Sequence, residues 1–205
     1  MGNLTSVIQF IYKRSYEDYV KRLDELRDPH IIYVTDLASC THKYYLRTQY
    51  PELLFRFEPV AILGEMVHAG LESILEKEGF EIEYEVSKQF TLNGGTYTLK
   101  GRIDAYNRST GVVVEIKTSR SSQGIPREHH LIQLQIYLNM VNASKGILLY
   151  ITPDRIAEYD IERQDLILED MMKNLINDNM HPRWDWECRY CIFSKMCPYR
   201  INKVD

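Results

Sequence analysis

Residues 112–119 read VVVEIKTS, and this stretch decides the fold because it joins a strongly apolar strand to two charges at its end. Three consecutive valines are typical of a strand that is covered on both faces. Side chains alternate along a strand, so Glu115 and Lys117 point to the same side. The sequence therefore predicts a carboxylate and an ammonium group side by side at the tip of a buried strand.

The residues before the valines predict an antiparallel partner strand at 96–107, joined by the four-residue loop RSTG. If Asn107 faces Val112, counting back places Asp104 directly opposite Glu115, with Cβ atoms ~5 Å apart. Two carboxylates so close need a cation between them, and oxygen ligands suit Mg²⁺ or Mn²⁺. A charged pair near a strand end is also common at a solvated edge, so both interpretations stay open.

The whole chain alternates between helical and strand patterns, which predicts an α/β fold with a mixed central β-sheet flanked by helices. A short helix capped by Thr35 or Asp36 is expected before Cys40. The longer elements are helices at 16–27, 59–78, 130–141 and 164–178, and strands at 81–92, 96–107, 112–119, 145–152 and 156–162.

The composition fits a single globular domain, residues 1–205, with 44% hydrophobic and 26% charged residues. The net charge of −4 argues against binding nucleic acid by bulk electrostatics, but not against an enzyme that holds cations with carboxylates. No apolar run approaches the ~20 residues that span a bilayer, and the N-terminus lacks a signal-peptide pattern. We therefore expect a cytoplasmic protein without membrane attachment.

Two helices carry polar residues on otherwise apolar faces. His68 lies beside the apolar stripe of the helix at 59–78, where a lone histidine is more often a hydrogen-bonded core residue than a ligand. Gln133 and Tyr137 are one turn apart, so they project from one side of the helix at 130–141. Tyr137 alone is typical of a core residue, whereas a buried Gln133 needs a polar partner.

The four cysteines are Cys40, Cys188, Cys191 and Cys197. The late three have the spacing C-x2-C-x5-C, which indicates a metal or cluster site that lacks one ligand. If the chain ends meet, Cys40 and the tail, residues 181–200, form one region that holds Zn²⁺ or an iron–sulfur cluster. The spacing slightly favours a cluster, and the tail aromatics would form its dry shell or a small core: Trp184, Trp186, Tyr190, Phe193 and Tyr199.

Two segments offer contacts to nucleic acid. Tyr44 and Tyr45 follow Cys40 among cations, so their rings can stack on bases while the cations meet phosphate. A helix that packs the tyrosines inward explains the same residues equally well. Arg120 lies in the polar loop after the charged strand, within reach of a phosphate near the metal.

Taken in order, these motifs resemble the RecB-like branch of the PD-(D/E)xK nucleases, which has a restriction-endonuclease-like core. The matching segments are His68, GRID at 101–104, EIK at 115–117 and QLQIY at 133–137. With Cys40 early and the cysteine trio late, the chain resembles the iron–sulfur members, and among them the CRISPR-associated exonuclease Cas4 family. The resemblance runs from about Thr35 to Pro198, while residues 1–30 carry no motif.

The resemblance implies a role for each motif residue. His68, Asp104, Glu115 and the backbone carbonyl of Ile116 would bind a catalytic Mn²⁺ or Mg²⁺. Lys117 would position the attacking water, while Gln133 and Tyr137 would orient Lys117 and the DNA strand. The four cysteines would hold a structural 4Fe-4S cluster.

The implied function is a metal-dependent deoxyribonuclease, an exonuclease that degrades single-stranded DNA from 5′ to 3′. It would trim DNA in CRISPR adaptation, with adaptation proteins as partners, and a homo-oligomer is left open. The same chemistry also serves recombination, repair or viral DNA processing. A non-catalytic scaffold that binds DNA or protein is a further alternative, although such a scaffold is expected to have lost part of the set His68, Asp104, Glu115 and Lys117.

Overall fold

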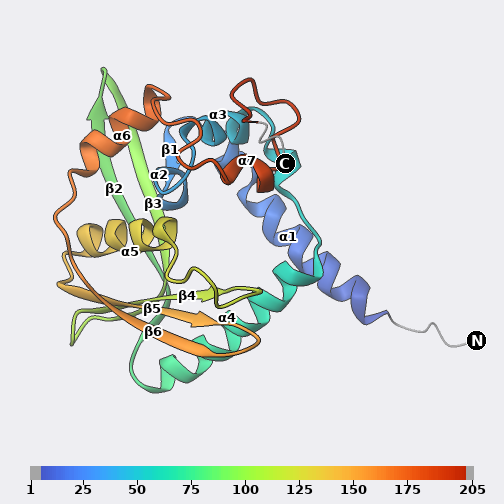
Figure 1. Ribbon diagram of the computed structural model, residues 1–205, viewed down its shortest axis with the longest axis vertical. Coiled ribbons are helices and arrows are strands. Elements are labelled where there is room, and N and C mark those ends of the chain that lie inside the picture. The colour runs from blue at the N-terminus through green and yellow to red at the C-terminus, as the bar shows by residue number, and fades with distance from the viewer. Residues whose placement is uncertain (1–5, 202–205) are drawn as a thin grey trace, which may run out of the picture.

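The computed structural model describes residues 6–201 and contains one mixed six-stranded sheet with helices on both faces (Figure 1). The strands are β1 Ile31–Tyr33, β2 Glu81–Leu92, β3 Gly95–Asn107, β4 Val112–Thr118, β5 Lys145–Ile151 and β6 Ile156–Glu162. The helices are α1 Val7–Arg27, α2 Val34–Leu37, α3 Thr41–Gln49, η1 Pro51–Leu54, α4 Pro59–Lys77, α5 Glu128–Val141, α6 Leu168–Ile176 and α7 Glu187–Tyr190. The predicted α/β class with a mixed central sheet is confirmed.

The strand order is β1-β3-β4-β5-β6, with β2 against β3. β1 runs parallel to β3 and β4 runs parallel to β5, while the other pairs are antiparallel. The counted register is confirmed where the β3–β4 ladder exists, because Asn107 pairs with Val112 and Ala105 with Val114. Asn107 also closes the loop, since its Oδ1 accepts the N–H groups of Ser109 and Thr110 at 3.1 Å.

One edge of β3 is shared by two different strands. β1 pairs with residues 98–100 and β4 pairs with residues 105–107, so the stretch 101–104 lies between the two ladders. β2 runs along the other edge, and its pairing is interrupted where Glu83 meets Asp104. Glu83 has a φ of 48°, a conformation rare for a residue other than glycine. The central strand is therefore irregular at the residue predicted to bind metal.

At this irregularity, the buried side chains of β2 and β3 change from one face of the sheet to the other. Ile103 and Tyr84 pack in the core beneath α5, whereas Ala105 and Ile82 pack in the core beneath α4. Figure 1 shows α4 and α5 on different sides of the β4–β6 strands. A residue at the change of face, such as Asp104, can therefore be reached by side chains from both layers.

Two of the three valines of β4, Val113 and Val114, are buried as expected. Val113 packs with Leu134 of α5, and Val114 packs with Leu71 and Leu75 of α4. β4 is thus covered on both faces, which is the condition that its apolar sequence predicted.

The N-terminal part differs from the sequence expectation in two ways. α1 begins at Val7 rather than at 16, and the expected short helix before Cys40, α2, follows β1 and has Tyr33 rather than Thr35 or Asp36 at its cap position. Asp36 is not the cap residue, because its carboxylate lies inside the first turn and accepts the Tyr33 N–H at 2.9 Å. Pairing with β3 decides this segment, and such tertiary contacts override local propensity. Within residues 6–201, no helix is both long and apolar enough to cross a membrane.

Candidate metal centre and cysteine cavity

The end of β4 holds a buried carboxylate that is bonded through one oxygen. Glu115 is 2% exposed, and its Oε1 lies 2.6 Å from Lys117 Nζ. Gln133 on α5 joins the two, because its Nε2 donates to Glu115 Oε1 at 2.7 Å and its Oε1 accepts from Lys117 Nζ at 2.9 Å. The second oxygen, Oε2, is buried without a hydrogen-bond partner. A buried charged atom without a partner is costly, so this oxygen has the character of a ligand.

The raised pKa of Glu115 also indicates that its carboxylate lacks a sufficient positive partner. Burial raises the pKa of Glu115 to about 7, Lys117 opposes that shift, and the nearby Asp104 adds to it. A divalent cation would favour the ionised carboxylate far more than one ammonium group does.

Asp104 occupies the gap on the edge of β3. Its Oδ2 accepts the backbone N–H of Ile116 at 2.6 Å, and its Oδ1 lies 3.4 Å from His68 Nδ1. The β3–β4 ladder ends at the pair Ala105–Val114, so the predicted direct pairing of Asp104 with Glu115 is wrong. The strands diverge at this point, and the Asp104 side chain accepts the N–H that a strand neighbour would otherwise accept.

His68 reaches this point from α4, which lies close to the end of β4. A Cβ on Gly64, one turn before His68, would lie 3.1 Å from Thr118 Oγ1. The hydrogen bond to Asp104 raises the pKa of His68. The absence of a side chain at Gly64 therefore leaves room for Thr118 at the end of β4.

Glu72 is a site residue that the sequence analysis missed. His68, Glu72 and Asp104 present ligand atoms that lie within 4.8 Å of one another, and His68 Nδ1 is 4.0 Å from Glu72 Oε1. The available signal was spacing, because residues four apart on a helix share a face. The structure thus brings together His68, Glu72 and Asp104, with Glu115, Lys117 and Gln133 beside them.

Tyr137 is a core residue, as the residue pattern alone predicted, and it does not face the DNA as the family resemblance implied. Its ring is 3% exposed, and its hydroxyl donates to the Arg102 carbonyl at 3.0 Å. A Cβ on Gly101 would lie 2.5 Å from the Tyr137 ring, so glycine is needed there. A buried ring does not contact DNA, and Tyr137 instead holds β3 at the gap between its two partner strands.

The predicted stacking of DNA on Tyr44 and Tyr45 is wrong. Tyr44 is 3% exposed, and its hydroxyl donates to the Pro29 carbonyl. Tyr45 is half-buried, and its hydroxyl donates to the Ile176 carbonyl. α3 packs both rings inward, which is the alternative that the sequence left open. Arg120 is exposed in the loop after β4.

The four cysteines come together although Cys40 and the trio lie far apart in sequence. All four line one cavity of about 230 Å³, and none forms a disulfide. Glu187 joins the Cys40 segment to the tail. Its Oε1 accepts the Cys40 N–H at 2.8 Å, and its Oε2 accepts the Arg183 N–H at 2.8 Å. Burial raises the pKa of Cys40 to about 11, so a bound metal or cluster is what would favour its thiolate.

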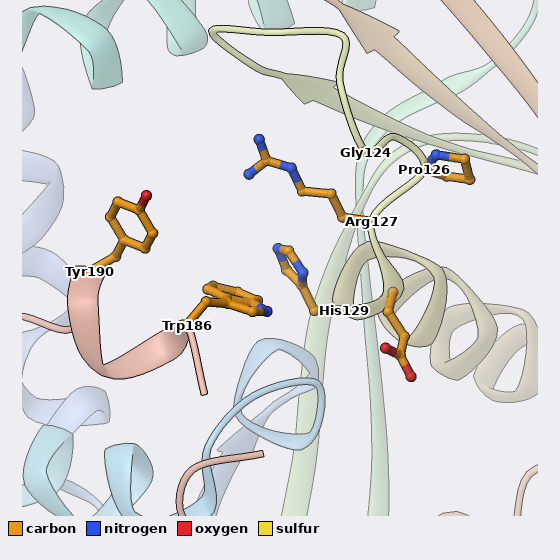
Figure 2. A pocket seen from close by; sticks show the side chains of 7 residues that line it. Gly124, Pro126, Arg127, His129, Trp186 and Tyr190 are labelled. Atoms are coloured by element: carbon orange, nitrogen blue, oxygen red, sulfur yellow. The ribbon is translucent and has the colours of Figure 1, made fainter. Parts of the chain in front are cut away.

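The tail aromatics divide into two groups. Phe193 is fully buried and belongs to the core, as expected of a dry shell. Trp186, Tyr190 and Tyr199 are instead 43%, 68% and 42% exposed. Trp186 and Tyr190 line the cysteine cavity but stay open to solvent on another side, where they also line the larger cavity of Figure 2.

Fold and site together define a PD-(D/E)XK nuclease, and a model of the PD-(D/E)XK nuclease superfamily matches residues 74–198. The CRISPR-associated exonuclease Cas4 of Saccharolobus solfataricus is 41% identical over 204 residues, which cover 96% of this chain and 100% of that protein. The chain therefore belongs to the PD-(D/E)XK nuclease superfamily and, within it, to the Cas4 family. It is a nuclease.

Solved structures agree with this assignment. The crystal structure of SSO0001 is 40% identical and covers 97% of this chain and 99% of that chain, with a TM-score of 0.89. The alkaline exonuclease LHK-Exo from Laribacter hongkongensis is 13% identical and covers 80% of this chain and 90% of that chain, with a TM-score of 0.54. The second likeness shows a shared fold.

Proposed function

We propose that this chain is a metal-dependent deoxyribonuclease that degrades single-stranded DNA from the 5′ end and trims DNA in CRISPR adaptation. The observation that carries the proposal is the unpaired, buried Oε2 of Glu115 beside Lys117, Asp104 and His68. Similarity to a CRISPR-associated exonuclease supports the DNA substrate and the pathway. The 5′-to-3′ polarity rests on the family resemblance, and adaptation proteins are the expected partners.

His68, Asp104, Glu115 and the Ile116 carbonyl would hold the cation. One imidazole and several oxygen ligands suit Mn²⁺ or Mg²⁺. The hydrogen bond from the Ile116 N–H to Asp104 fixes the backbone next to that carbonyl. When bound, the cation lowers the pKa of a water and offsets negative charge on the phosphate.

Lys117 is held in place to act on the substrate. Two contacts, to Glu115 Oε1 and Gln133 Oε1, fix its ammonium group, which has three N–H donors. The third donor can orient a water or stabilise charge on a phosphate oxygen. Gln133 fixes the orientation of Lys117, because its amide bonds to both Lys117 and Glu115.

The cysteine region would hold a 4Fe-4S cluster with a structural role. The four thiols line one cavity, and four thiolates are the ligand set of such a cluster. The family resemblance favours the cluster over a single Zn²⁺. Cys40 and residues 181–200 would then form one region within a single nuclease domain, residues 1–205.

The test is cleavage of end-labelled single- and double-stranded DNA with Mn²⁺, with Mg²⁺ or with chelator. We expect the wild type to shorten single strands from the 5′ end in the presence of either metal and to be inactive with chelator. Glu115→Ala should abolish cleavage, while Glu76→Ala, an exposed residue on α4, should not. Undiminished cleavage by Glu115→Ala, or a metal-loaded wild type without nuclease activity, would contradict the proposal.

A further inference from the structure

A second cavity lies between the start of α5 and α7, and it has a volume of about 570 Å³. Figure 2 shows Arg127 and His129 on one side of it and Trp186 and Tyr190 on the other. Its aromatic residues also line the cysteine cavity, so the two cavities share a wall. Neither the metal centre nor the cysteine site accounts for this feature.

Partly exposed aromatic rings form one wall of the cavity. Trp186 lies 4.9 Å from His129 and 6.5 Å from Tyr190, measured between ring centroids. Trp184 stacks on Trp186 with ring centroids 5.9 Å apart, and its Nε1 donates to Glu128 Oε2 at 3.0 Å. Trp186 and Tyr190 stay 43% and 68% exposed, so a flat ligand can stack on them.

Arg127 can bind an anion beside that flat ligand, while Glu128, the acidic residue that lines the cavity, is bonded to Trp184. Arg127 precedes α5, and its Nη2 donates to Ser119 Oγ at 2.9 Å, in the loop that follows β4. The start of this 14-residue helix adds a positive end. Burial, together with Arg127 and Lys117, lowers the pKa of His129 to about 4, so near neutral pH His129 is an uncharged ring.

The cavity also lies next to the catalytic lysine. His129 and Gln133 are four residues apart on α5, so they lie on one face about one helical turn, ~5.4 Å, apart. Gln133 contacts Lys117 directly. A DNA strand with a phosphate at Lys117 therefore has its neighbouring nucleotide near the aromatic wall.

We propose that this cavity is a subsite for unpaired bases of the DNA strand, with a base stacked on Trp186 beside His129 and Tyr190 and a phosphate on Arg127. The inference rests on the proposed nuclease function and adds the origin of its preference for single strands. Bases in a duplex have both faces covered by their neighbours, so only an unpaired base can stack on the wall. Base–aromatic stacking tolerates any sequence.

The test measures binding without cleavage, in the Glu115→Ala background with chelator. Fluorescence anisotropy compares an oligothymidylate with an abasic oligonucleotide of equal length. Trp186→Ala should weaken oligothymidylate binding by about 5- to 100-fold and leave abasic binding unchanged. Arg127→Ala should weaken both ligands alike and reduce the salt dependence by about one phosphate contact. Phe10→Ala, which removes an exposed ring of α1, is the matched control.

Two results would overturn the subsite. The first is unchanged oligothymidylate binding by Trp186→Ala, and the second is an equal loss for both oligonucleotides. If Trp186→Ala has a lower melting temperature than the Phe10→Ala control, the Trp186→Phe variant separates stacking from instability. This variant keeps a flat ring, so it must retain the preference for oligothymidylate. Residual cleavage by the Glu115→Ala background would contradict the proposed function instead, so the two failures are distinguishable.

Discussion

Lys117 and Glu115 illustrate how single residues build this site. Their contact at 2.6 Å uses one carboxylate oxygen and leaves the other unpaired in the protein interior. Alternation along a strand was enough to predict that the two charges share a side. The residue pattern predicted only that Gln133 needs a polar partner, because helix and strand positions do not reveal which groups meet. The family resemblance named Lys117 as that partner, and the two side chains do bond.

Metal binding should depend on pH through Glu115 and His68. Both groups must be deprotonated to act as ligands, and the pKa of each is raised, that of Glu115 to about 7 by burial and that of His68 by its bond to Asp104. Protons therefore compete with the cation as the pH falls, and Mn²⁺ affinity should drop about tenfold or more between pH 8 and pH 6. Titration followed by electron paramagnetic resonance measures this, and equal affinities at the two pH values would contradict it.

Glu72 should support the metal centre by positioning His68. Glu72→Gln removes a charge 4.0 Å from His68 Nδ1, and we expect Mn²⁺ affinity to fall by about tenfold. Glu76→Gln, one turn further along α4 and exposed, is the matched control. The same Mn²⁺ titration applies, and a Glu72→Gln variant that binds like the control would exclude this role.

At the scale of elements, the site exists because β3 changes partners. Its residues 101–104 lie between the β1 and β4 ladders, and Asp104 and Tyr137 bond to the backbone there. The loop length and the alternating pattern predicted the β3–β4 register correctly. The interruption at Glu83 was not predictable, because a positive φ at a glutamate has no local sequence signal and arises from tertiary packing.

Gly101 should be essential to this arrangement. An added methyl group would meet the Tyr137 ring at 2.5 Å and Val34 Cγ2 at 2.8 Å. Gly101→Ala should therefore lower the free energy of unfolding by about 1–3 kcal/mol, through overpacking. Gly70→Ala on α4, where no atom lies within 4 Å, should instead be neutral or stabilising by up to about 1 kcal/mol. Urea denaturation measures both, and equal stabilities would contradict the packing argument.

At the scale of the whole molecule, the tail is fastened to the segment around Cys40. Besides the hydrogen bonds that Glu187 accepts, the Thr41 N–H donates to the Met180 carbonyl at 2.8 Å, and Arg183 Nη2 donates to the Leu37 carbonyl at 2.8 Å. The cysteine spacing predicted a shared site, but its position depends on these polar contacts. The exposed tail rings were not predictable either, because composition does not distinguish a dry shell from a binding wall.

The cysteine region should contain iron. Protein purified without oxygen is expected to be brown and to hold about four irons per chain, because four thiolates are the ligand set of a 4Fe-4S cluster. Cys191→Ser should lower the melting temperature, since the cluster joins distant parts of the chain. Metal analysis and thermal melting measure both effects. A colourless protein with one zinc per chain would refute the cluster, and an unchanged melting temperature would refute its structural role.

The central claim, that Glu115 completes a metal centre with His68 and Asp104, is tested most directly by anomalous diffraction from a crystal soaked in Mn²⁺. The account predicts an anomalous Mn²⁺ peak, separate from the signal of the cluster iron, with ligand distances of about 2.0–2.3 Å to His68, Asp104 and Glu115 and to the Ile116 carbonyl. A peak coordinated by His68, Glu72 and Asp104, with Glu115 left to Lys117 alone, would contradict it.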